Sequence, residues 1–277
     1  MRPTANMHTH TAFCDGKNTP EQMVEAAIRL GLTDLGFSGH SPAPFDPDYS
    51  LRDPDAYYRK MEELKQRFQG QIRIYAGEEM DFYAPPSRQD CDFLIGSVHY
   101  FLDRQTGTHY ALDADRQDLQ HALDVVFHGD ARAMVKEFYR MSAELAVTRK
   151  PDIIGHFDLI VKLNAHGTFF DETSTWYRHT ALEAITQAAA SGAVFEVNTG
   201  GMYRGYRKAP YPADFLLTRL LELGAPVTLS SDSHDIHSLT FEFPSCLARL
   251  QALGFSSVQV YEDGAFREKG IRDLQGE

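Results

Sequence analysis

The sequence predicts an α/β fold whose parallel strands close into a barrel, with residues 1–277 forming a single domain. Three observations support this fold. Apolar, β-branched segments alternate with helical patterns along the chain, as in parallel strands joined by right-handed crossovers. The length of 277 residues suits one such barrel. Histidines and carboxylates recur where the expected strands end, and a closed barrel gathers many strand ends around one centre, whereas an open sheet gathers side chains mainly at its switch point.

Seven segments are expected to be strands because they are short, apolar and rich in β-branched residues, and an eighth is a weaker candidate. In chain order they are Ala5–Thr9, Asp34–Ser38, Gln71–Glu79, Phe93–Val98, Asp152–His156, Ala193–Asn198, Val227–Ser231 and Ser256–Tyr261. Candidate metal ligands lie at or just after the ends of the first seven, if Glu196 or Asn198 serves for the sixth.

Helices are expected between these strands. Thr19, Pro20 and Glu21 form an N-cap, a proline in the first helical position and an acidic first turn, and Asp53-Pro54 repeats the signal. Several of the helical patterns end at a glycine, which favours a helix stop. The later helices are expected at Asp115–Phe127, Asp130–Thr148, Thr175–Ala190, Pro212–Leu223 and Leu239–Leu253.

Composition and charge limit the classes of partner. The net charge of −12, without a basic stripe, argues against a nucleic-acid partner. No run of about 18 apolar residues could span a bilayer, and the start of the sequence lacks the apolar core of a secretion signal. We therefore expect a cytoplasmic protein that binds no membrane. The three cysteines are too few and too scattered for a disulfide framework. A homo-oligomer is compatible with these properties.

Two pairs of polar residues are spaced so that both side chains of a pair face the same way. His8 and His10 are separated by one residue on an extended segment, and side chains at i and i+2 of a strand share a face. Asp232 and His234 repeat this spacing near the other end of the chain. Either pair alone is more simply explained as surface polar residues, but that explanation weakens when both pairs coexist with further histidines at strand ends.

Those further histidines are His40, His99 and His156, and Asp15 and Glu79 are carboxylates in similar positions. Neutral imidazole and carboxylate together suit zinc, manganese or iron. Because there are more candidate ligands than one ion can use, the sequence predicts a multinuclear metal site. Such a site is typical of hydrolytic enzymes.

Four carboxylates leave alternatives open. Glu78 and Glu79 both end the third strand, and alternation does not choose between them because parallel strands are apolar on both faces. Asp158 either orients an imidazole or caps the following segment. Glu196 is expected to support a ligand or contact the substrate rather than to bind a further metal.

As a set, these motifs resemble the PHP (polymerase and histidinol phosphatase) superfamily, and the resemblance runs from residue 8 to residue 234. The segment that begins Glu196-Val197-Asn198-Thr199-Gly200-Gly201 is similar to the histidinol-phosphatase branch. The motifs that carry the resemblance are His8-Thr9-His10 with Asp15, His40, Gly77-Glu78-Glu79-Met80-Asp81, Ser97-Val98-His99, Gly155-His156-Phe157-Asp158 and Ser231-Asp232-Ser233-His234.

The resemblance implies a distorted (β/α)7 TIM-like barrel with a metal site at the carboxyl ends of the strands. It also implies two to three divalent transition metals, with Glu79 rather than Glu78 as the bridging carboxylate. The ligands would be His8, His10 and Asp232 for one metal; Glu79, His99 and His156 for a second; and Asp15, His40 and His234 for a third. A carboxylate at Asp15 favours manganese or iron more than an imidazole would.

The function that follows from the resemblance is that of a phosphoric monoester hydrolase, acting on L-histidinol phosphate in histidine biosynthesis. The partner would be a small phosphorylated metabolite. The expected mechanism is in-line attack on phosphorus by hydroxide that the metals generate from water. Asp15, Asp232 and His234 are the catalytic candidates, and the sequence does not assign the group that protonates the leaving alkoxide.

Three loops offer candidate substrate contacts. Arg204, Arg207 and Lys208 form a basic cluster after the sixth strand, where a guanidinium could bind phosphate oxygens, although a solvated loop is the commoner explanation. Lys162, after the fifth strand, is a weaker candidate. In the loop between residues 41 and 53, a solvated surface is as good an explanation as contact with the ammonium and imidazole of the substrate; the polar residues there are Asp46, Asp48 and Tyr49.

Two other functions compete with this prediction. One is a PHP phosphoesterase that acts on a different ester, such as a sugar phosphate or a nucleotide. The other is a metal-binding accessory domain without catalytic activity. The full ligand set argues against loss of catalysis, and the absence of a basic surface argues against a polymerase module.

Overall fold

The computed structural model describes residues 4–87 and 91–276, and its main feature is one large, mostly parallel sheet. The strands of this sheet are β1 (Ala5–Asn6), β2 (Asp34–His40), β3 (Arg73–Asp81), β4 (Leu94–Ser97), β7 (Ile153–Ile154), β8 (Val194–Asn198), β9 (Val227–Ser230), β10 (Ser257–Glu262) and β11 (Ala265–Gly270). Their spatial order is β1-β2-β3-β4-β7-β8-β9-β10-β11, and the strands up to β10 pair in parallel. The mixed α/β class predicted from the sequence is therefore confirmed.

All eight expected strands are present, with ends that differ by a few residues from those predicted. Three strands were not predicted. A hairpin of β5 (Tyr100–Leu102) and β6 (His109–Ala111) forms a separate two-stranded sheet, and β11 pairs antiparallel with β10. The hairpin follows β4 directly, so it extends over the carboxyl ends of the parallel strands.

The barrel is distorted because the sheet does not close through a full ladder. Among the described residues, β1 lies at one edge of the sheet, and its continuation meets the segment after β9 through an isolated parallel bridge between Thr9 and Ser233. The backbone N–H of His10 donates to the Ser233 carbonyl at 2.7 Å, and the Ser233 N–H donates to the His8 carbonyl at 3.1 Å. The distorted barrel predicted from the sequence is thus confirmed, with its two ends joined by this bridge rather than by a full ladder.

The first two helices begin where the sequence signals predict, whereas the helix expected at Leu239–Leu253 begins at Phe243. Thr19 caps α1 through a reciprocal pair of bonds: its hydroxyl accepts from the Gln22 N–H, and the Gln22 side chain accepts from the Thr19 N–H. Gly31 ends this helix at a φ of 79°, a conformation that suits glycine. The helices are α1 (Pro20–Leu30), α2 (Pro54–Arg67), α3 (Arg116–Phe127), α4 (Ala131–Arg149), α5 (Thr175–Ala189), α6 (Gly200–Tyr203), α7 (Asp214–Leu223), α8 (Phe243–Leu253) and α9 (Ile271–Gln275), with two 3-10 turns, η1 (Leu159–Val161) and η2 (Ala165–Gly167).

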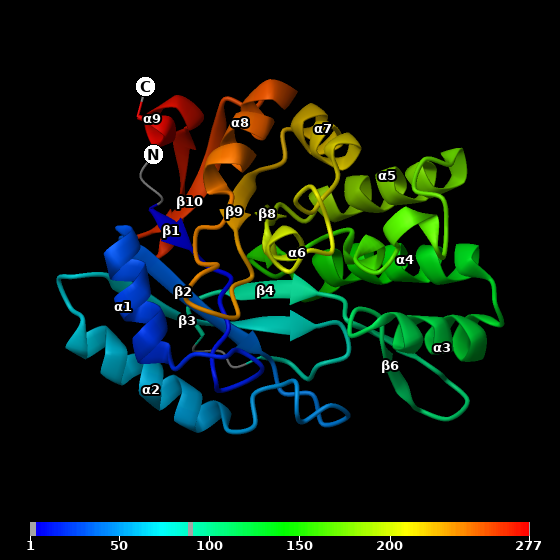
Figure 1. The fold of residues 1–277 in the computed structure, drawn as a ribbon, viewed down its shortest axis with the longest axis horizontal. Helices are drawn as coiled ribbons and strands as arrows, with labels where there is room; N and C mark the ends of the chain where they lie inside the picture. Colours follow the sequence, from blue (N-terminus) through cyan, green and yellow to red (C-terminus); the bar gives the residue numbers. More distant parts are fainter. Residues whose placement is uncertain (1–3, 88–90, 277) are drawn as a thin grey trace.

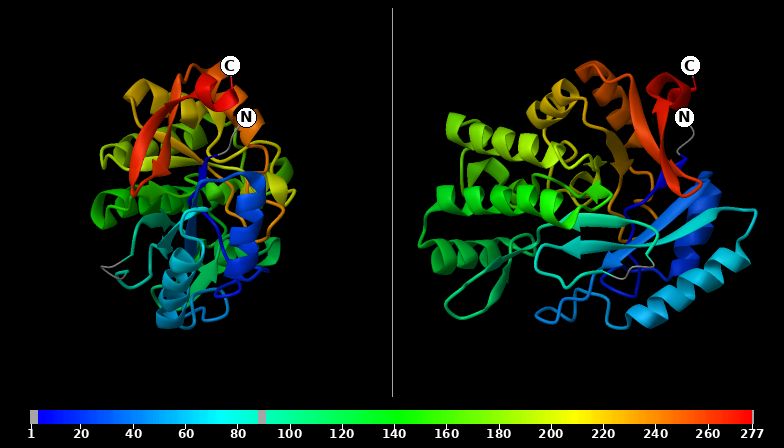
Figure 2. Two further views of the ribbon diagram at one scale, coloured as in Figure 1. Left: turned by 90° about the vertical axis from the view of Figure 1, so that its left-hand side faces the viewer. Right: turned by 180° about the vertical axis from the view of Figure 1, so that it is seen from behind.

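The helices cover the sheet on opposite sides. Figures 1 and 2 show α1 and α2 beside β2 and β3, and α3, α4 and α5 on the other side of the molecule. Each group packs on its own apolar cluster, the first centred on residues such as Met23 and Tyr57, the second on residues such as Phe138 and Phe195. A third, small cluster that includes Met7 and Phe93 fills the space between the strands. None of the described helices is long and apolar enough to cross a bilayer.

Candidate metal centre

Nine histidines and carboxylates, from both ends of the chain, converge at the carboxyl ends of the strands. Their ligand atoms form four overlapping groups, in each of which the atoms lie within 4.8 Å of one another. His40 and Glu79 belong to β2 and β3, and the others follow strands or, for Asp15, precede α1. The nine are His8, His10, Asp15, His40, Glu79, His99, His156, Asp232 and His234. These are the residues that the sequence motifs single out, and their role as metal ligands stays a prediction.

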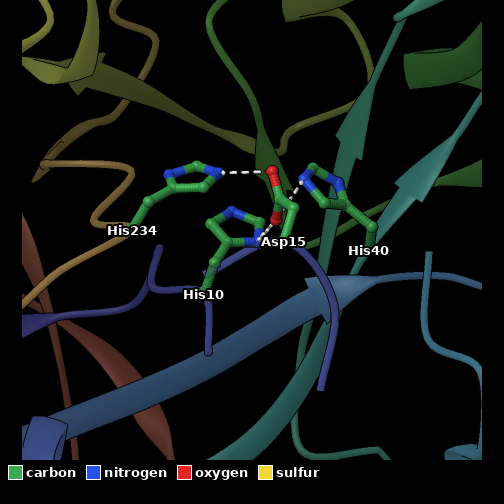
Figure 3. A group of neighbouring side chains, drawn as sticks. All are labelled: His10, Asp15, His40 and His234. Carbon is green, nitrogen blue, oxygen red and sulfur yellow. Dashed lines mark ion pairs between the residues drawn. The ribbon is translucent and has the colours of Figure 1, made fainter. Parts of the chain in front are cut away.

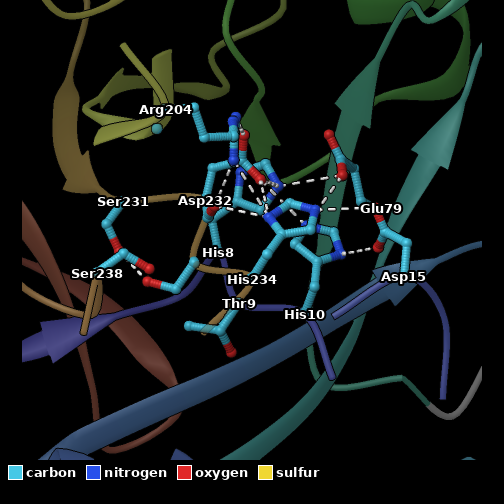
Figure 4. Close-up of polar contacts among 12 residues, drawn as sticks. His8, Thr9, His10, Asp15, Glu79, Arg204, Ser231, Asp232, His234 and Ser238 are labelled. Carbon is cyan, nitrogen blue, oxygen red and sulfur yellow. Dashed lines mark hydrogen bonds and ion pairs between the residues drawn. The ribbon is translucent and has the colours of Figure 1, made fainter. Parts of the chain in front are cut away.

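The isolated bridge brings the two i, i+2 pairs together. Thr9 lies between His8 and His10, and its hydroxyl points the other way, donating to the Gly36 carbonyl at 2.6 Å. The two imidazoles therefore share one face. Their Nε2 atoms lie 3.5 and 3.3 Å from Oδ1 of Asp232, which stands directly before the other half of the bridge. Three potential ligands thus face one point (Figure 4).

Glu79 has a carboxylate whose two oxygens face different groups of imidazoles. Oε1 lies 3.4 Å from His99 Nε2 and 3.0 Å from His156 Nε2. Oε2 lies 3.1 Å from His8 Nε2 and 3.1 Å from His40 Nδ1. A carboxylate in this orientation can contact two cations, one through each oxygen, which is the arrangement expected of a bridging ligand.

A third group surrounds Asp15 near the opening of the cluster (Figure 3). Its carboxylate lies 3.0 Å from His234 Nε2, 3.5 Å from His40 Nε2 and 3.8 Å from His10 Nδ1. The side chains of Asp15 and His234 are 28 and 21 % exposed, whereas those of His8, His10 and Glu79 are fully buried. This group is therefore the part of the cluster that a ligand in solution can reach.

The residues fit bound metal ions. Several buried atoms that point into the cluster have no hydrogen-bond partner, including Nε2 of His8, His10 and His40 and Oε2 of Glu79. Such atoms are costly to bury unless something satisfies them. Nitrogen and oxygen ligands about 2.0–2.2 Å from a tetrahedral zinc are roughly 3.3–3.6 Å apart. The separations of 3.0–3.4 Å among His99, His156 and Glu79 are close to that spacing.

Further buried groups hold the ligand candidates in place. Glu196 accepts at Oε2 from the Ser230 hydroxyl at 2.6 Å, and the same oxygen lies 2.8 Å from His8 Nδ1. A carboxylate on the far nitrogen fixes the orientation of a metal-binding imidazole. Ser97 donates to Glu79 Oε1 at 2.6 Å. Gly155 is needed beside it, because a Cβ there would collide with the Ser97 hydroxyl oxygen.

Burial and neighbouring charges shift the pKa values of the side chains in the cluster. Burial, together with the neighbouring His40 and His234, lowers the pKa of His10 to about 3. Burial also opposes the charged form of His40, but Asp15 and Glu79 outweigh it and raise the pKa of this imidazole to about 9. Burial alone would raise the pKa of Glu79, yet the surrounding histidines hold it well below its usual range. Glu79 is therefore ionised, as a metal ligand must be.

A cavity of about 300 Å³ opens above the cluster, and Arg204 and Lys162 are the basic residues that line it. Arg204 donates from Nη2 to Asp232 Oδ2 at 2.7 Å and from Nη1 to the Asp232 carbonyl at 3.0 Å (Figure 4). Arg207 does not line the cavity, because Glu172 accepts both of its terminal N–H groups at 2.7 and 3.0 Å. Lys208 is exposed and also lies outside it. The basic loop thus brings one of its three residues to the cavity.

The loop between residues 41 and 53 divides in the same way. Asp46 and Tyr49 line the cavity, whereas the side chain of Asp48 is 91 % exposed and pairs with Arg52 at 2.6 Å. Two polar residues of the lining, Tyr100 and Asp113, were not predicted from the sequence. Both lie in or next to the unpredicted hairpin, and no motif marks them.

The structure shows the contacts of two carboxylates for which the sequence leaves alternatives open, and of a third, Asp81. Glu78 is buried away from the cluster and accepts from the Tyr58 hydroxyl at 2.7 Å. Asp158 stands at the N-cap position of η1 but makes no side-chain cap; its Oδ2 accepts the Ala213 N–H at 2.9 Å. Asp81, for which no role was predicted, accepts the His99 N–H at 2.8 Å. Its position two residues after Glu79, on the same strand face, was the available signal.

Comparisons with known proteins agree with this geometry. A family model described as "PHP domain" matches residues 6–200. A Schizosaccharomyces pombe protein named "Probable histidinol-phosphatase" is 27 % identical, covering 93 % of this chain and 89 % of its own. A Bacillus subtilis protein named "Histidinol-phosphatase" is 26 % identical, and the match covers 87 % of this chain and 97 % of that protein. The fold is also similar to the structure of a Lactococcus lactis histidinol phosphate phosphatase complexed with zinc, L-histidinol and phosphate. The two superpose with a TM-score of 0.69 at 20 % identity, over 96 % of this chain and 100 % of the other.

Proposed function

The chain belongs to the PHP domain family, and on that premise we propose that it is a metal-dependent phosphoric monoester hydrolase that converts L-histidinol phosphate and water to L-histidinol and phosphate. The names of its relatives support this substrate. The observation that carries the proposal is the orientation of Glu79, whose two oxygens face separate groups of imidazoles beneath a cavity that contains Arg204. This arrangement suits the polynuclear hydrolysis of a phosphate ester.

The contacts support three metal positions. Glu79 would join the first two positions, and the third group is the partly exposed one. His8, His10 and Asp232 would hold the first metal, His99 and His156 the second, and Asp15, His40 and His234 the third. When bound, divalent metals would lower the pKa of a water molecule and neutralise charge on the phosphoryl oxygens. Zinc, manganese and iron suit these ligands.

Residues of the chain itself would orient the ester in the cavity. Arg204 presents a guanidinium to the cavity and is held there by Asp232, so it can bind phosphate oxygens without losing much conformational freedom. Asp15 and His234 are the catalytic candidates that a leaving alkoxide can reach, because both are partly exposed. Asp232 is less accessible: one oxygen faces His8 and His10 and the other accepts from Arg204.

Phosphate release from a panel of esters tests the proposal. The panel should contain histidinol phosphate, sugar phosphates and nucleotides, each assayed with zinc, manganese and iron. We expect histidinol phosphate to give the highest kcat/KM and metal analysis to find at least two metal equivalents per chain. A metal-free sample should be inactive. Full turnover without metal, or a clear preference for a sugar phosphate or nucleotide, would contradict the proposal. A cytoplasmic location and a homo-oligomer stay predictions.

A further inference from the structure

The cavity wall holds one carboxylate whose charge is not balanced by a neighbouring side chain. Five carboxylates line the cavity: Asp15, Asp46, Glu79, Asp113 and Asp232. Three of them face the imidazoles or Arg204, and Asp113 pairs with Lys162 Nζ at 2.8 Å. Within the described part of the chain, no Lys, Arg or His nitrogen forms an ion pair with Asp46. Its Oδ2 accepts from the neutral Tyr100 hydroxyl at 2.9 Å.

Asp46 is also held in place, unlike a residue of a loosely solvated loop. Its N–H donates to the Ala43 carbonyl at 2.9 Å, and its carbonyl accepts from the Ser50 hydroxyl at 3.1 Å. Phe45, the preceding residue, stacks on His109 of the β5–β6 hairpin at 3.8 Å between ring centroids. A partly buried, unpaired negative charge is unfavourable in a protein with a net charge of −12. A positively charged ligand would remove that penalty.

The aromatic surroundings favour a cation over a neutral group. Tyr100 contacts Phe45 edge-on at 4.9 Å, and Tyr49 stacks on His40 at 3.8 Å, so both tyrosines are fixed beside Asp46 and the metal cluster. Aromatic faces attract ammonium ions, and a carboxylate next to them strengthens the attraction. The basic residues of the cavity, Arg204 and Lys162, come from loops after β8 and β7, whereas Asp46 comes from the loop after β2.

We propose that Asp46 binds the ammonium group of the substrate and thereby selects amino-alcohol phosphates over sugar phosphates. This inference rests on the proposed function. In histidinol phosphate the ammonium is on the carbon next to the CH2 group that carries the phosphate ester oxygen. One cavity can therefore bind the ammonium and the phosphate together. Asp113 is excluded from this role because Lys162 already balances its charge. Sugar phosphates carry no cation, so they gain less from Asp46 than an ammonium does.

A comparison of two substrates tests this role directly. The pair is histidinol phosphate and 3-(imidazol-4-yl)propyl phosphate, which differs only by lacking the ammonium. In Asp46→Asn, the ratio of their kcat/KM values should fall by roughly 10- to 150-fold, as expected for loss of one charge-assisted contact. Asp48→Asn is the matched control, because Asp48 belongs to the same loop but pairs with Arg52 at the surface. Its ratio should equal that of the wild type.

A second variant keeps the test valid if Asp46→Asn folds poorly. Tyr100→Phe retains the Asp46 charge but removes its hydrogen bond, so the ratio should fall by a smaller factor. If the wild-type protein hydrolyses histidinol phosphate but both variants keep the wild-type ratio, Asp46 does not bind the ammonium and the inference alone is wrong. If the wild type hydrolyses neither imidazole ester while it hydrolyses other phosphomonoesters, the proposed function is wrong and the inference falls with it.

Discussion

The metal-facing side of the cavity and its loop-facing side are held by different kinds of contact. On the metal side, His40 and Glu79 belong to strands that pair residue by residue, and the other ligand candidates follow strand ends. On the loop side, pairs of side chains such as Asp46 with Tyr100 and Arg207 with Glu172 fix the chain. The sheet therefore positions His40 and Glu79 directly, whereas the cavity loops are fixed by contacts between side chains. Substrate selectivity in such a fold is expected to depend on the loops.

The sharpest test of this division compares two neighbouring residues of β3. In Glu79→Gln, two groups of imidazoles lose the negative charge between them, so we expect loss of metal and of activity by far more than 100-fold. Glu78→Gln is the matched control and should keep its metals, because Glu78 faces Tyr58 instead. Metal titration with phosphate release measures both. A metal-poor Glu78→Gln protein would mean that Glu78, and not Glu79, faces the metals and that the ligand of β3 is assigned to the wrong residue.

The next test concerns the two arginines of the basic loop. Arg204→Ala should lower kcat/KM by about 10- to 150-fold, since it removes a charge-assisted contact with phosphate of roughly 1.5–3 kcal/mol. Metal content should be unchanged, because Asp232 faces the histidines with Oδ1 and contacts Arg204 only through Oδ2 and its carbonyl. Arg207→Ala should leave the kinetics near wild type because Arg207 pairs with Glu172 outside the cavity. Equal losses in both variants would contradict this assignment.

The smallest expected effect is that of changing Glu196, which contacts His8 on the side of the ring away from the cluster. Glu196→Gln weakens the support of His8 without removing a ligand candidate, so metal affinity should fall by about 10- to 100-fold. Excess metal should restore most of the activity, whereas it should not restore Arg204→Ala. If added metal fails to rescue Glu196→Gln, Glu196 contacts the substrate, which is the other role that the sequence left open for it.

The sequence predicted the metal side better than the loop side for a physical reason. Strands and i, i+2 pairs leave periodic signals, so the strand segments and the clustering of their polar ends could be expected from the residues alone. Periodicity did not separate Glu78 from Glu79, because β3 is buried on both faces. Arg204 and Arg207 look equivalent in sequence. Only the structure shows that Arg204 lines the cavity while Arg207 pairs with Glu172 outside it. Asp113 and Tyr100 depend on a hairpin with three-residue strands, too short to give a clear pattern.

The bridge between Thr9 and Ser233 makes the metal centre part of the architecture as well as the chemistry. Two backbone hydrogen bonds join the segments that follow β1 and β9 there, and His8, His10 and Asp232 flank these bonds. An ion shared by these side chains would act as a cross-link between segments separated by most of the chain, and such links limit the freedom of the unfolded state. The resistance of this protein to unfolding would then follow the supply of metal, so a cell short of metal would lose the folded enzyme along with its activity.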